Sequence, residues 1–155
     1  MARFVFRLQS VLNIKLRLEE QQKLDFAAAR RRLDDEELKL AGLFDRLSFY
    51  EDEGRRLRDS NLILQDILDN EESIVRIKEY IVDQQKAVKK AEEALEVERL
   101  KLVEAIKERK MYERLREKAF EEFMAEENHK EGVENDEHNS FVYSRRQLEA
   151  TGANR

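Results

Sequence analysis

The sequence contains no proline and no cysteine, and it has only four glycines in 155 residues. Proline and glycine are the residues that most often interrupt helices and form turns, so their scarcity predicts long helices with few breaks. The lack of cysteine excludes disulfide bonds and thiolate metal sites, which is compatible with a reducing cytoplasm. Apolar runs extend over only a few residues, so the sequence offers no candidate for a membrane-spanning helix.

What the sequence has in abundance is charge. Charged residues make up 42% of the chain and apolar residues 41%, whereas a typical globular domain is about 25% charged. The apolar share is enough for a stripe along a helix but small for a closed core, because much of it is leucine and alanine at spaced positions. The composition therefore predicts an all-α protein built from amphipathic helices.

The second half of the chain carries a regular heptad pattern. One set of apolar residues recurs at intervals of seven, and a second set lies three residues after each of them: Ile74, Ile81, Val88, Leu95 and Leu102, with Ile77, Gln84, Ala91, Glu98 and Ala105. Charged residues fill most positions between them. Such an a/d pattern is typical of a coiled-coil helix, which we expect over about residues 74–125.

The first half shows the same period with more defects. One register is followed by Phe4, Leu8, Val11 and Leu18, and another by Ala29, Leu33, Leu40, Leu43, Leu47, Tyr50 and Leu57. Between Leu18 and Phe26 the register slips, as though four residues were inserted, which predicts a local unwinding of the supercoil. We expect a helix over about residues 4–58.

A turn between the two helices completes the predicted fold. Residues 58–61 and 69–73 are rich in Asp, Asn and Ser, which compete for backbone hydrogen bonds, so we place the reversal within about 58–73. Neither amphipathic helix can bury its apolar stripe alone. The predicted fold class is all-α, an antiparallel two-helix coiled-coil hairpin over residues 1–125, followed by a frayed, acidic and partly disordered tail over residues 126–155.

Charge is unevenly distributed along the chain. Residues 1–32 carry a net charge of +5, residues 33–73 of −8, residues 74–118 of +3 and residues 119–155 of −5. Folding into a hairpin would gather acidic residues at the turn and basic residues at the open end. Such a rod suits a connector between two different partners, although the same pattern could simply fix the antiparallel register.

No pattern of a catalytic, cofactor or metal site is present in the sequence. The HExxH, CxxC, GxGxxG and P-loop motifs are absent, and a hairpin offers no cleft for its many carboxylates. His129 and His138, together with Glu134 and Asp136, could be imagined as metal ligands, but exposed polar residues of a tail are the simpler interpretation. We expect a protein that is not an enzyme and that uses no cofactor or metal.

Two basic clusters, residues 30–32 and 107–118, raise the question of nucleic-acid binding. A phosphate-binding surface has to stay basic over its whole extent, whereas acidic neighbours interrupt both clusters and the sequence pI is about 5.3. We therefore expect no nucleic-acid partner.

The N-terminus resembles a known family. Residues 4–12, Phe-Val-Phe-Arg-Leu-Gln-Ser-Val-Leu, are similar to the opening signature of the FliJ family, an aromatic-x-aromatic-x-Leu-Gln-x-Val-Leu pattern that leads into a charged helix. Residues 105–118, with the pair Arg109 and Lys110, resemble the family as well. So do the acidic residues 134–137 that precede Arg145 and Arg146. The resemblance extends over nearly the whole chain.

FliJ-type proteins are small coiled-coil components of flagellar type III export, and the resemblance implies the same function here. It implies as partners the hexameric export ATPase FliI, the export-gate protein FlhA, FliH and export chaperones. As in the γ stalk of rotary ATPases, the open end would sit in the ATPase ring while the tip contacts the cytoplasmic domain of FlhA. The expected location is cytoplasmic, peripheral at the cytoplasmic face of the inner membrane. A generic coiled-coil scaffold and the related stalk of a type III injectisome are the alternatives.

The resemblance also implies two sets of contact residues. The set at the ATPase end is Phe4, Phe6, Arg7, Leu8, Arg109, Lys110, Arg114 and Arg116. Phe6 stands out because a helical seam that uses Phe4 and Leu8 leaves it pointing away, an apolar side chain without cover. The set at the gate end is Leu43, Leu47, Tyr50, Tyr80, Gln84 and Ala87. For the second set, ordinary packing in the seam is the competing interpretation.

Overall fold

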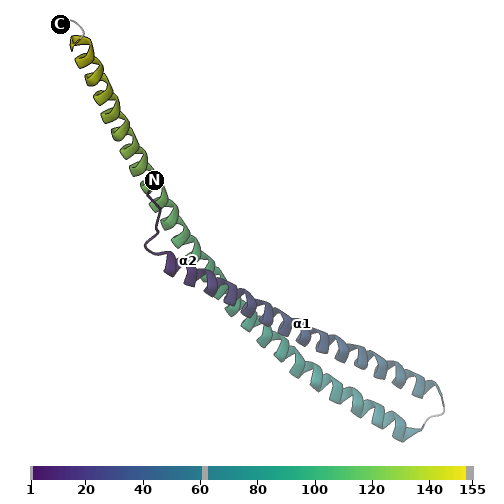
Figure 1. Ribbon diagram of the computed structural model, residues 1–155. Coiled ribbons are helices and arrows are strands. Elements are labelled where there is room, and N and C mark those ends of the chain that lie inside the picture. Colours follow the sequence, from purple (N-terminus) through teal and green to yellow (C-terminus); the bar gives the residue numbers. More distant parts are fainter. Residues whose placement is uncertain (1, 61–62, 153–155) are drawn as a thin grey trace. The chain divides into compact units, whose positions relative to one another are not determined.

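A computed structural model shows the chain as two long helices (Figure 1). The structure describes residues 2–60 and 63–152. Helix α1 spans Gln9–Asp59 and helix α2 spans Leu64–Gly152, so the chain reverses direction within the predicted turn region. The predicted all-α, antiparallel two-helix hairpin is confirmed. Over the described residues, neither helix has a stretch apolar enough to cross a membrane.

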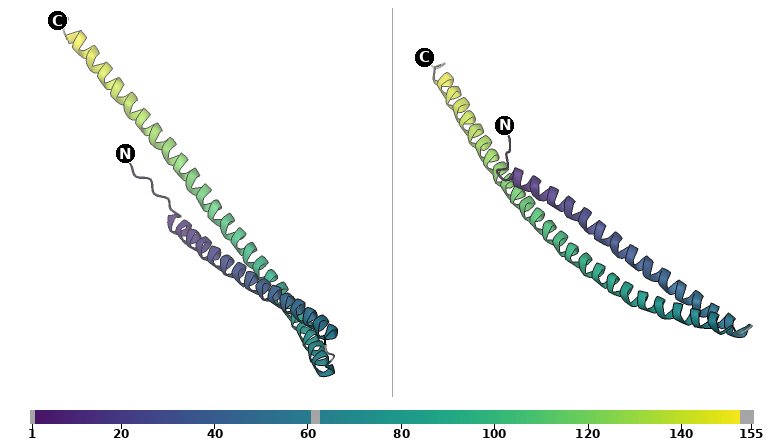
Figure 2. Two further views of the ribbon diagram at one scale, coloured as in Figure 1. Left: turned by 90° about the vertical axis from the view of Figure 1, so that its right-hand side faces the viewer. Right: turned by 90° about the horizontal axis from the view of Figure 1, so that it is seen from below.

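The chain divides into two compact units, and each unit contains a part of both helices. Unit 1 consists of Met1–Leu16 and Lys107–Arg155, and unit 2 consists of Arg17–Ile106. In unit 2, α1 and α2 lie side by side and run in opposite directions, as all the ribbon views show (Figures 1 and 2).

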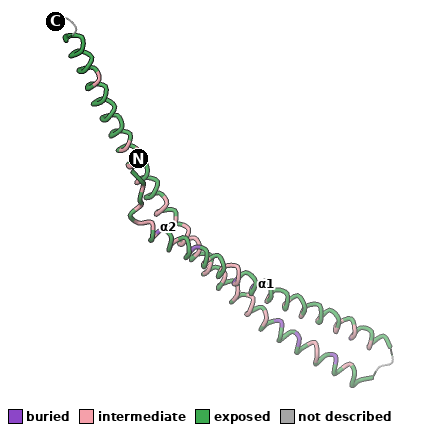
Figure 3. Tube along the Cα trace, in the orientation of Figure 1, coloured by how far each residue is buried: buried purple, intermediate pink, exposed green. Residues whose placement is uncertain are grey.

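The heptad pattern predicted for α2 is confirmed. All ten residues of its two sets are buried or half-buried, and Ile77 and Ile81 are the most deeply buried of them. In unit 2, buried and half-buried positions recur along α2 (Figure 3). The charged residues between them are exposed. The stripe of the second helix therefore packs as the sequence predicts.

The register slip predicted for α1 is wrong. Every residue at alternating intervals of four and three from Leu8 to Leu57 is buried or half-buried, without a break. Leu18, which was assigned to the seam, is 50% exposed, whereas its neighbour Glu19 is only 5% exposed. Apolar side chains alone are a misleading guide here, because the seam between Leu12 and Phe26 is occupied by polar residues.

Two matched polar pairs show how unit 2 accommodates such residues. Gln22 Nε2 donates to the main-chain oxygen of Glu98 at 3.4 Å and also to the Glu98 carboxylate. Gln84 Nε2 donates to the main-chain oxygen of Glu36 at 2.9 Å and also to the Glu36 carboxylate. A polar group inside a seam is tolerated when it is hydrogen-bonded, and these bonds fix the register of the two helices.

A third polar contact lies closer to the turn. Asn70 is 7% exposed, and its Nδ2 donates to the main-chain oxygen of Tyr50 at 2.9 Å. The opposing residue is Gly54, where an added Cβ would lie 2.5 Å from Asn70 Oδ1. Glycine is therefore required at position 54 because the Asn70 amide occupies the place of a side chain.

This contact explains why α2 begins earlier than predicted, at Leu64 rather than at about 74. The polar residues 69–73 look like a turn, yet Asn70 has its hydrogen-bond partner in the seam, and Ser73 Oγ donates back to the Asp69 main-chain oxygen at 2.9 Å. With no proline or glycine among them, these residues remain helical.

The other helix bounds also differ from the predicted ones. Residues 2–8 are not helical, so α1 begins at Gln9 rather than at about 4, and α2 continues to Gly152 rather than ending at about 125. Ion pairs one turn apart support the helix there, with Lys130 Nζ at 3.9 Å from Glu126 and Arg145 Nε at 3.5 Å from Glu149. The division into a hairpin and a separate tail stays a prediction.

Candidate partner-binding surfaces

In unit 1, the N-terminal segment packs against α2 through an aromatic cluster. The ring centre of Phe4 lies 5.2 Å from that of Phe120, edge to face, and 5.4 Å from that of Phe123. The guanidinium of Arg116 lies 5.5 Å from the centre of the Phe4 ring, a cation–π distance, and Arg116 Nε donates to Gln9 Oε1 at 3.0 Å. Aromatic packing and the arginine together anchor residues 2–8 to α2.

The anchored segment follows a period of two rather than a helical period. Phe4, Phe6 and Leu8 are half-buried, whereas Val5 and Arg7 are exposed. Alternation of this kind is typical of extended chain, and the first turn forms only where the Gln9 N–H donates to the Phe6 carbonyl at 3.1 Å. The expectation that Phe6 points away without cover is therefore wrong, and Val5, 77% exposed, is the uncovered apolar side chain.

A hollow runs between this segment and α2. It is lined by Phe4, Val5, Phe6, Arg7, Leu8, Leu115, Ala119, Glu122, Phe123 and Glu126. Four residues of the predicted ATPase-end set, those of the N-terminal segment, thus lie together.

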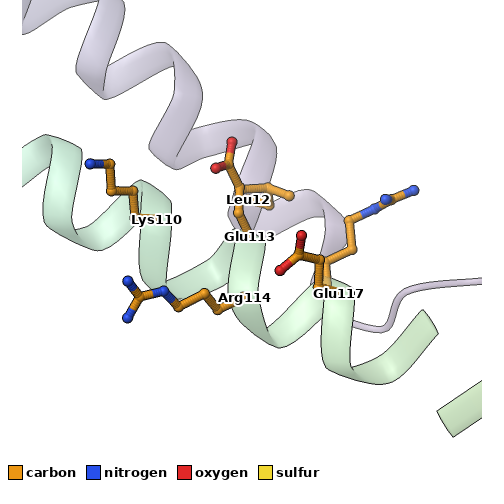
Figure 4. A pocket seen from close by; sticks show the side chains of 6 residues that line it. Leu12, Lys110, Glu113, Arg114 and Glu117 are labelled. Atoms are coloured by element: carbon orange, nitrogen blue, oxygen red, sulfur yellow. The ribbon is translucent and has the colours of Figure 1, made fainter. Parts of the chain in front are cut away.

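The four predicted basic residues of α2 divide into two kinds. Arg109 and Arg116 are engaged within unit 1, since Arg109 Nη1 lies 2.8 Å from the Glu113 carboxylate and Arg116 contacts Phe4. Lys110 and Arg114 are exposed and leave α2 beside a hollow to which α1 contributes Leu12 (Figure 4). Only these two are free to meet a partner without breaking an existing contact.

Lys110 and Arg114 belong to a basic face of α2 that also includes Lys107 and Lys118. The four residues are spaced by three, four and four, so they share one side of the helix, and all of them are exposed. None of them makes an ion pair with the part of the chain that the structure describes. Met111, 51% exposed, lies among them, which gives the face an apolar contact as well as positive charge.

A further ion pair of unit 1 lies next to this region. Lys15 Nζ lies 2.8 Å from Glu108 Oε2 and 6.0 Å from the centre of the Tyr112 ring. The hydrogen bond to Glu108 raises the pKa of Lys15 above its ordinary value of 10.5. Lys15 therefore stays charged in its seam position at neutral pH, with its charge satisfied across the two helices.

In unit 2, a groove lies between α1 and α2. Its walls are formed by Lys39, Gly42, Leu43 and Arg46 of α1 and by Tyr80, Asp83 and Gln84 of α2. The structure thus brings together Leu43, Tyr80 and Gln84 of the predicted gate-end set, and Tyr80 is 51% exposed rather than packed in the seam.

The remaining gate-end residues lie outside this groove. Leu47, Tyr50 and Ala87 are half-buried, and the Tyr50 ring packs edge to face on Phe49 with ring centres 5.5 Å apart. Their burial is what seam packing requires. Sequence reasoning missed Gly42, because glycine in a helical pattern reads as a defect rather than as part of a surface.

Neither histidine is part of a metal cluster in the described chain, where no group of three or more His, Asp or Glu side chains is arranged to hold an ion.

The sequence profile of the family described as "Flagellar FliJ protein" matches residues 4–148. The match includes both the N-terminal segment and almost all of α2. This chain belongs to the FliJ family. Membership associates this FliJ protein with the flagellar export apparatus, as the resemblance of its first residues predicted.

A solved structure supports the fold. A Chlamydia trachomatis protein, CT670, reported as a YscO homologue, is similar to this FliJ protein with a TM-score of 0.69 and 21% sequence identity, over 96% of this chain and 99% of that one. At this level of identity the likeness concerns the helical hairpin only. Among curated proteins, none matches the chain.

Proposed function

We propose that this FliJ protein is a non-enzymatic stalk and adaptor of the flagellar type III export apparatus. It binds the ring of the export ATPase FliI through unit 1 and the cytoplasmic domain of the export-gate protein FlhA through unit 2. In this way it assists the export of flagellar proteins at the cytoplasmic face of the inner membrane. FliH and export chaperones are further partners. This function requires no catalytic residue in the chain, because it works by differential binding to states of the ring and of the gate.

The observation that carries the proposal for unit 1 is the basic face of Lys107, Lys110, Arg114 and Lys118. Charges without an internal partner add nothing to the fold and repel one another, so their value lies in an acidic partner surface. The anchored N-terminal segment next to them adds apolar contacts from Val5. Together they supply what an interface needs, apolar anchors with charge around them.

The proposal for unit 1 is tested with purified protein and its cognate ATPase FliI. The wild type should raise the rate of ATP hydrolysis or favour assembly of the ATPase hexamer. The double charge reversal Lys110→Glu with Arg114→Glu should weaken binding to the ATPase. The concentration of this protein that gives half-maximal stimulation should then rise about tenfold, which corresponds to ~1.4 kcal/mol of binding free energy.

A matched control separates this surface from general electrostatics. Lys86 and Lys90 are also exposed, also four residues apart on α2, and lie in unit 2. Lys86→Glu with Lys90→Glu makes the same change in net charge and should leave the stimulation unchanged. Equal losses in both double variants, or no stimulation by the wild type, would contradict the proposal.

The proposal for unit 2 is tested by binding to the cytoplasmic domain of FlhA, measured by calorimetry. Tyr80→Ala should weaken binding without lowering the melting temperature, because the side chain is half exposed and lines the groove. Tyr143→Ala, at another exposed tyrosine of α2, is the control and should bind normally. Tyr50→Ala should lower the melting temperature as well, since Tyr50 is half-buried.

A second candidate is the stalk of a type III injectisome, which the likeness to the YscO homologue favours at the level of the fold. The same ATPase assay distinguishes the two candidates. An injectisome stalk would stimulate an injectisome ATPase and leave FliI unaffected.

A further inference from the structure

Gly42 lies inside α1 at a place where the chain itself gives no reason for glycine. No described glycine has a positive φ, so the backbone does not require one, and an ideal Cβ at position 42 would meet no atom within 4 Å. Gly54 of the same helix differs, because there Asn70 fills the place of a side chain. A helix with glycine at an interior position is less stable than the same helix with alanine there. The open space at Gly42 is therefore available to something outside this chain.

Gly42 forms part of the wall of the groove in unit 2. The α1 wall is built by residues at i, i+3, i+4 and i+7, from Lys39 to Arg46, and the α2 wall by Tyr80, Asp83 and Gln84 at i, i+3 and i+4. A groove with helical spacing on both walls matches the spacing of side chains on a third helix. Both walls are helices whose backbone groups are already bonded within each helix, so an extended peptide would find no strand edge to pair with.

The apolar surface continues beyond the groove along α1. Leu38 and Phe49 lie four residues before and seven residues after Gly42, on the same side of the helix. They are 73% and 61% exposed. Apolar side chains of this size that frame a glycine form a strip on which another helix can approach closely.

The charges on the rim specify the other face of such a helix. Lys39 and Arg46 are seven residues apart, which is two helical turns or about 10.5 Å. Lys39 has only a 3.6 Å contact with Glu36, and Arg46 makes no ion pair within the described chain. Asp83 stands on the opposite wall. A partner helix with carboxylates seven residues apart on one edge and a basic residue on the other edge is complementary to this rim.

We propose that the groove binds an amphipathic α-helix of a partner protein. This helix packs a small or apolar residue against Gly42 and directs two carboxylates, seven residues apart, to Lys39 and Arg46. The inference deepens the proposed function and rests on it for the partner's place in the export apparatus. The chemistry of the partner helix follows from the groove alone.

The test is photo-crosslinking in cells of the species of origin. A benzoyl-phenylalanine photocrosslinker replaces Phe49 of α1, next to the groove, and in a control chain it replaces Tyr143, an exposed aromatic residue of α2. Mass spectrometry then identifies the peptide joined at position 49. The expected adduct is a helical segment with carboxylates seven residues apart, and it is absent from the control.

Variants at two open glycines show whether the groove itself is occupied. Gly42→Gln fills the groove and should lower the yield of the adduct by about tenfold or more. Gly132→Gln makes the same change at a helical glycine that also has nothing within 4 Å, and it should leave the yield unchanged. Thermal unfolding of both variants should occur no lower than in the wild type, so the loss cannot come from misfolding.

Charge reversal tests the complementarity. Arg46→Glu should lower the adduct yield, and replacing the matching carboxylate of the partner by arginine should restore it. The inference is overturned by the absence of an adduct, by an adduct with a segment that is not helical, or by an adduct that persists with Gly42→Gln. A helix from a protein other than the gate leaves the groove inference intact and removes the gate assignment. If the gate domain binds Gly42→Gln as well as it binds the wild type, the groove inference is removed and the gate assignment stays intact.

Discussion

Gly54→Ala is the substitution whose effect follows most directly from the structure. In most helices such a change is stabilising by about 1 kcal/mol, because alanine has the higher helix propensity. Here the new Cβ would lie 2.5 Å from Asn70 Oδ1 and 3.5 Å from Asn70 Cγ. The Asn70 amide is buried and bonded to the Tyr50 carbonyl, so it has to move.

The opposing contributions can be compared. Displacing Asn70 from its hydrogen bond while it stays buried costs about 1–3 kcal/mol, and overpacking of a filled site costs a further ~1–3 kcal/mol. Against the gain of about 1 kcal/mol in helix propensity, the expected net effect of Gly54→Ala is a loss of roughly 1–5 kcal/mol in the free energy of unfolding.

The assay is urea unfolding followed by circular dichroism at 222 nm. Gly42→Ala is the matched control, because it makes the same change in the same helix where nothing lies within 4 Å. It should stabilise by up to about 1 kcal/mol, so the two substitutions are expected to have opposite signs. Adding Asn70→Ala to Gly54→Ala removes the obstacle and should recover most of the loss. If Gly54→Ala were as stable as Gly42→Ala, the argument that the Asn70 amide occupies the place of a side chain at position 54 would be refuted.

Three further predictions concern other contacts. Phe4→Ala should release the N-terminal segment, because it removes the ring at the centre of the aromatic cluster, and this would appear as faster proteolysis before α1 with little change in the unfolding midpoint. Gln84→Ala should lose about 1 kcal/mol of stability in urea unfolding, whereas leucine at both Gln84 and Glu36 should be neutral or stabilising, since no polar group is then left unpaired; a loss in the double variant as large as in the single one would contradict this. Because Glu108 raises the pKa of Lys15 above 10.5, the charged lysine stabilises the fold fully below that pH. The stability difference between wild type and Lys15→Met should therefore stay constant up to pH 10.5 and shrink as the pH rises further. A stability difference that changes between pH 6 and 9 would refute this prediction.

The fold was predictable because the second helix follows its heptads closely. Ile77 and Ile81 pack as their spacing requires, and the absence of proline left long helices as the only economical solution. The register of α1 was not predictable from apolar residues. Glu19 is buried, with Lys23 of the same helix at 3.7 Å, while Leu18 is exposed. Gln22 and Glu36, also in the seam, find their partners on the other helix, and a single sequence does not reveal such pairs.

The candidate surfaces were predictable in part. Leu43 and Tyr80 of the predicted gate-end set meet in one groove. Gly42 has no side chain that a sequence pattern could single out, since it contributes only the space that it leaves. At the N-terminus, the alternation from Phe4 to Leu8 is typical of an extended segment, but it directly precedes a helical pattern and therefore resembles the start of that helix. The aromatic partners of Phe4, more than a hundred residues away in the sequence, could not be found without the pairing of the two helices.

The two Gln–Glu pairs of unit 2 have a consequence for how the chain recognises itself. Each helix carries glutamine, alanine and glutamate at intervals of seven in the same order: Gln22, Ala29 and Glu36 in α1, and Gln84, Ala91 and Glu98 in α2. When two such triplets run in opposite directions, the glutamine of each faces the glutamate of the other, as the pairs Gln22–Glu98 and Gln84–Glu36 show. Each triplet is therefore complementary to the other triplet and equally to a second copy of itself. This stretch therefore specifies an antiparallel orientation without specifying which helix is the partner. The choice of the chain's own second helix over that of a neighbouring molecule falls to the short connection and to asymmetric contacts such as the one near it, where Asn70 meets Gly54.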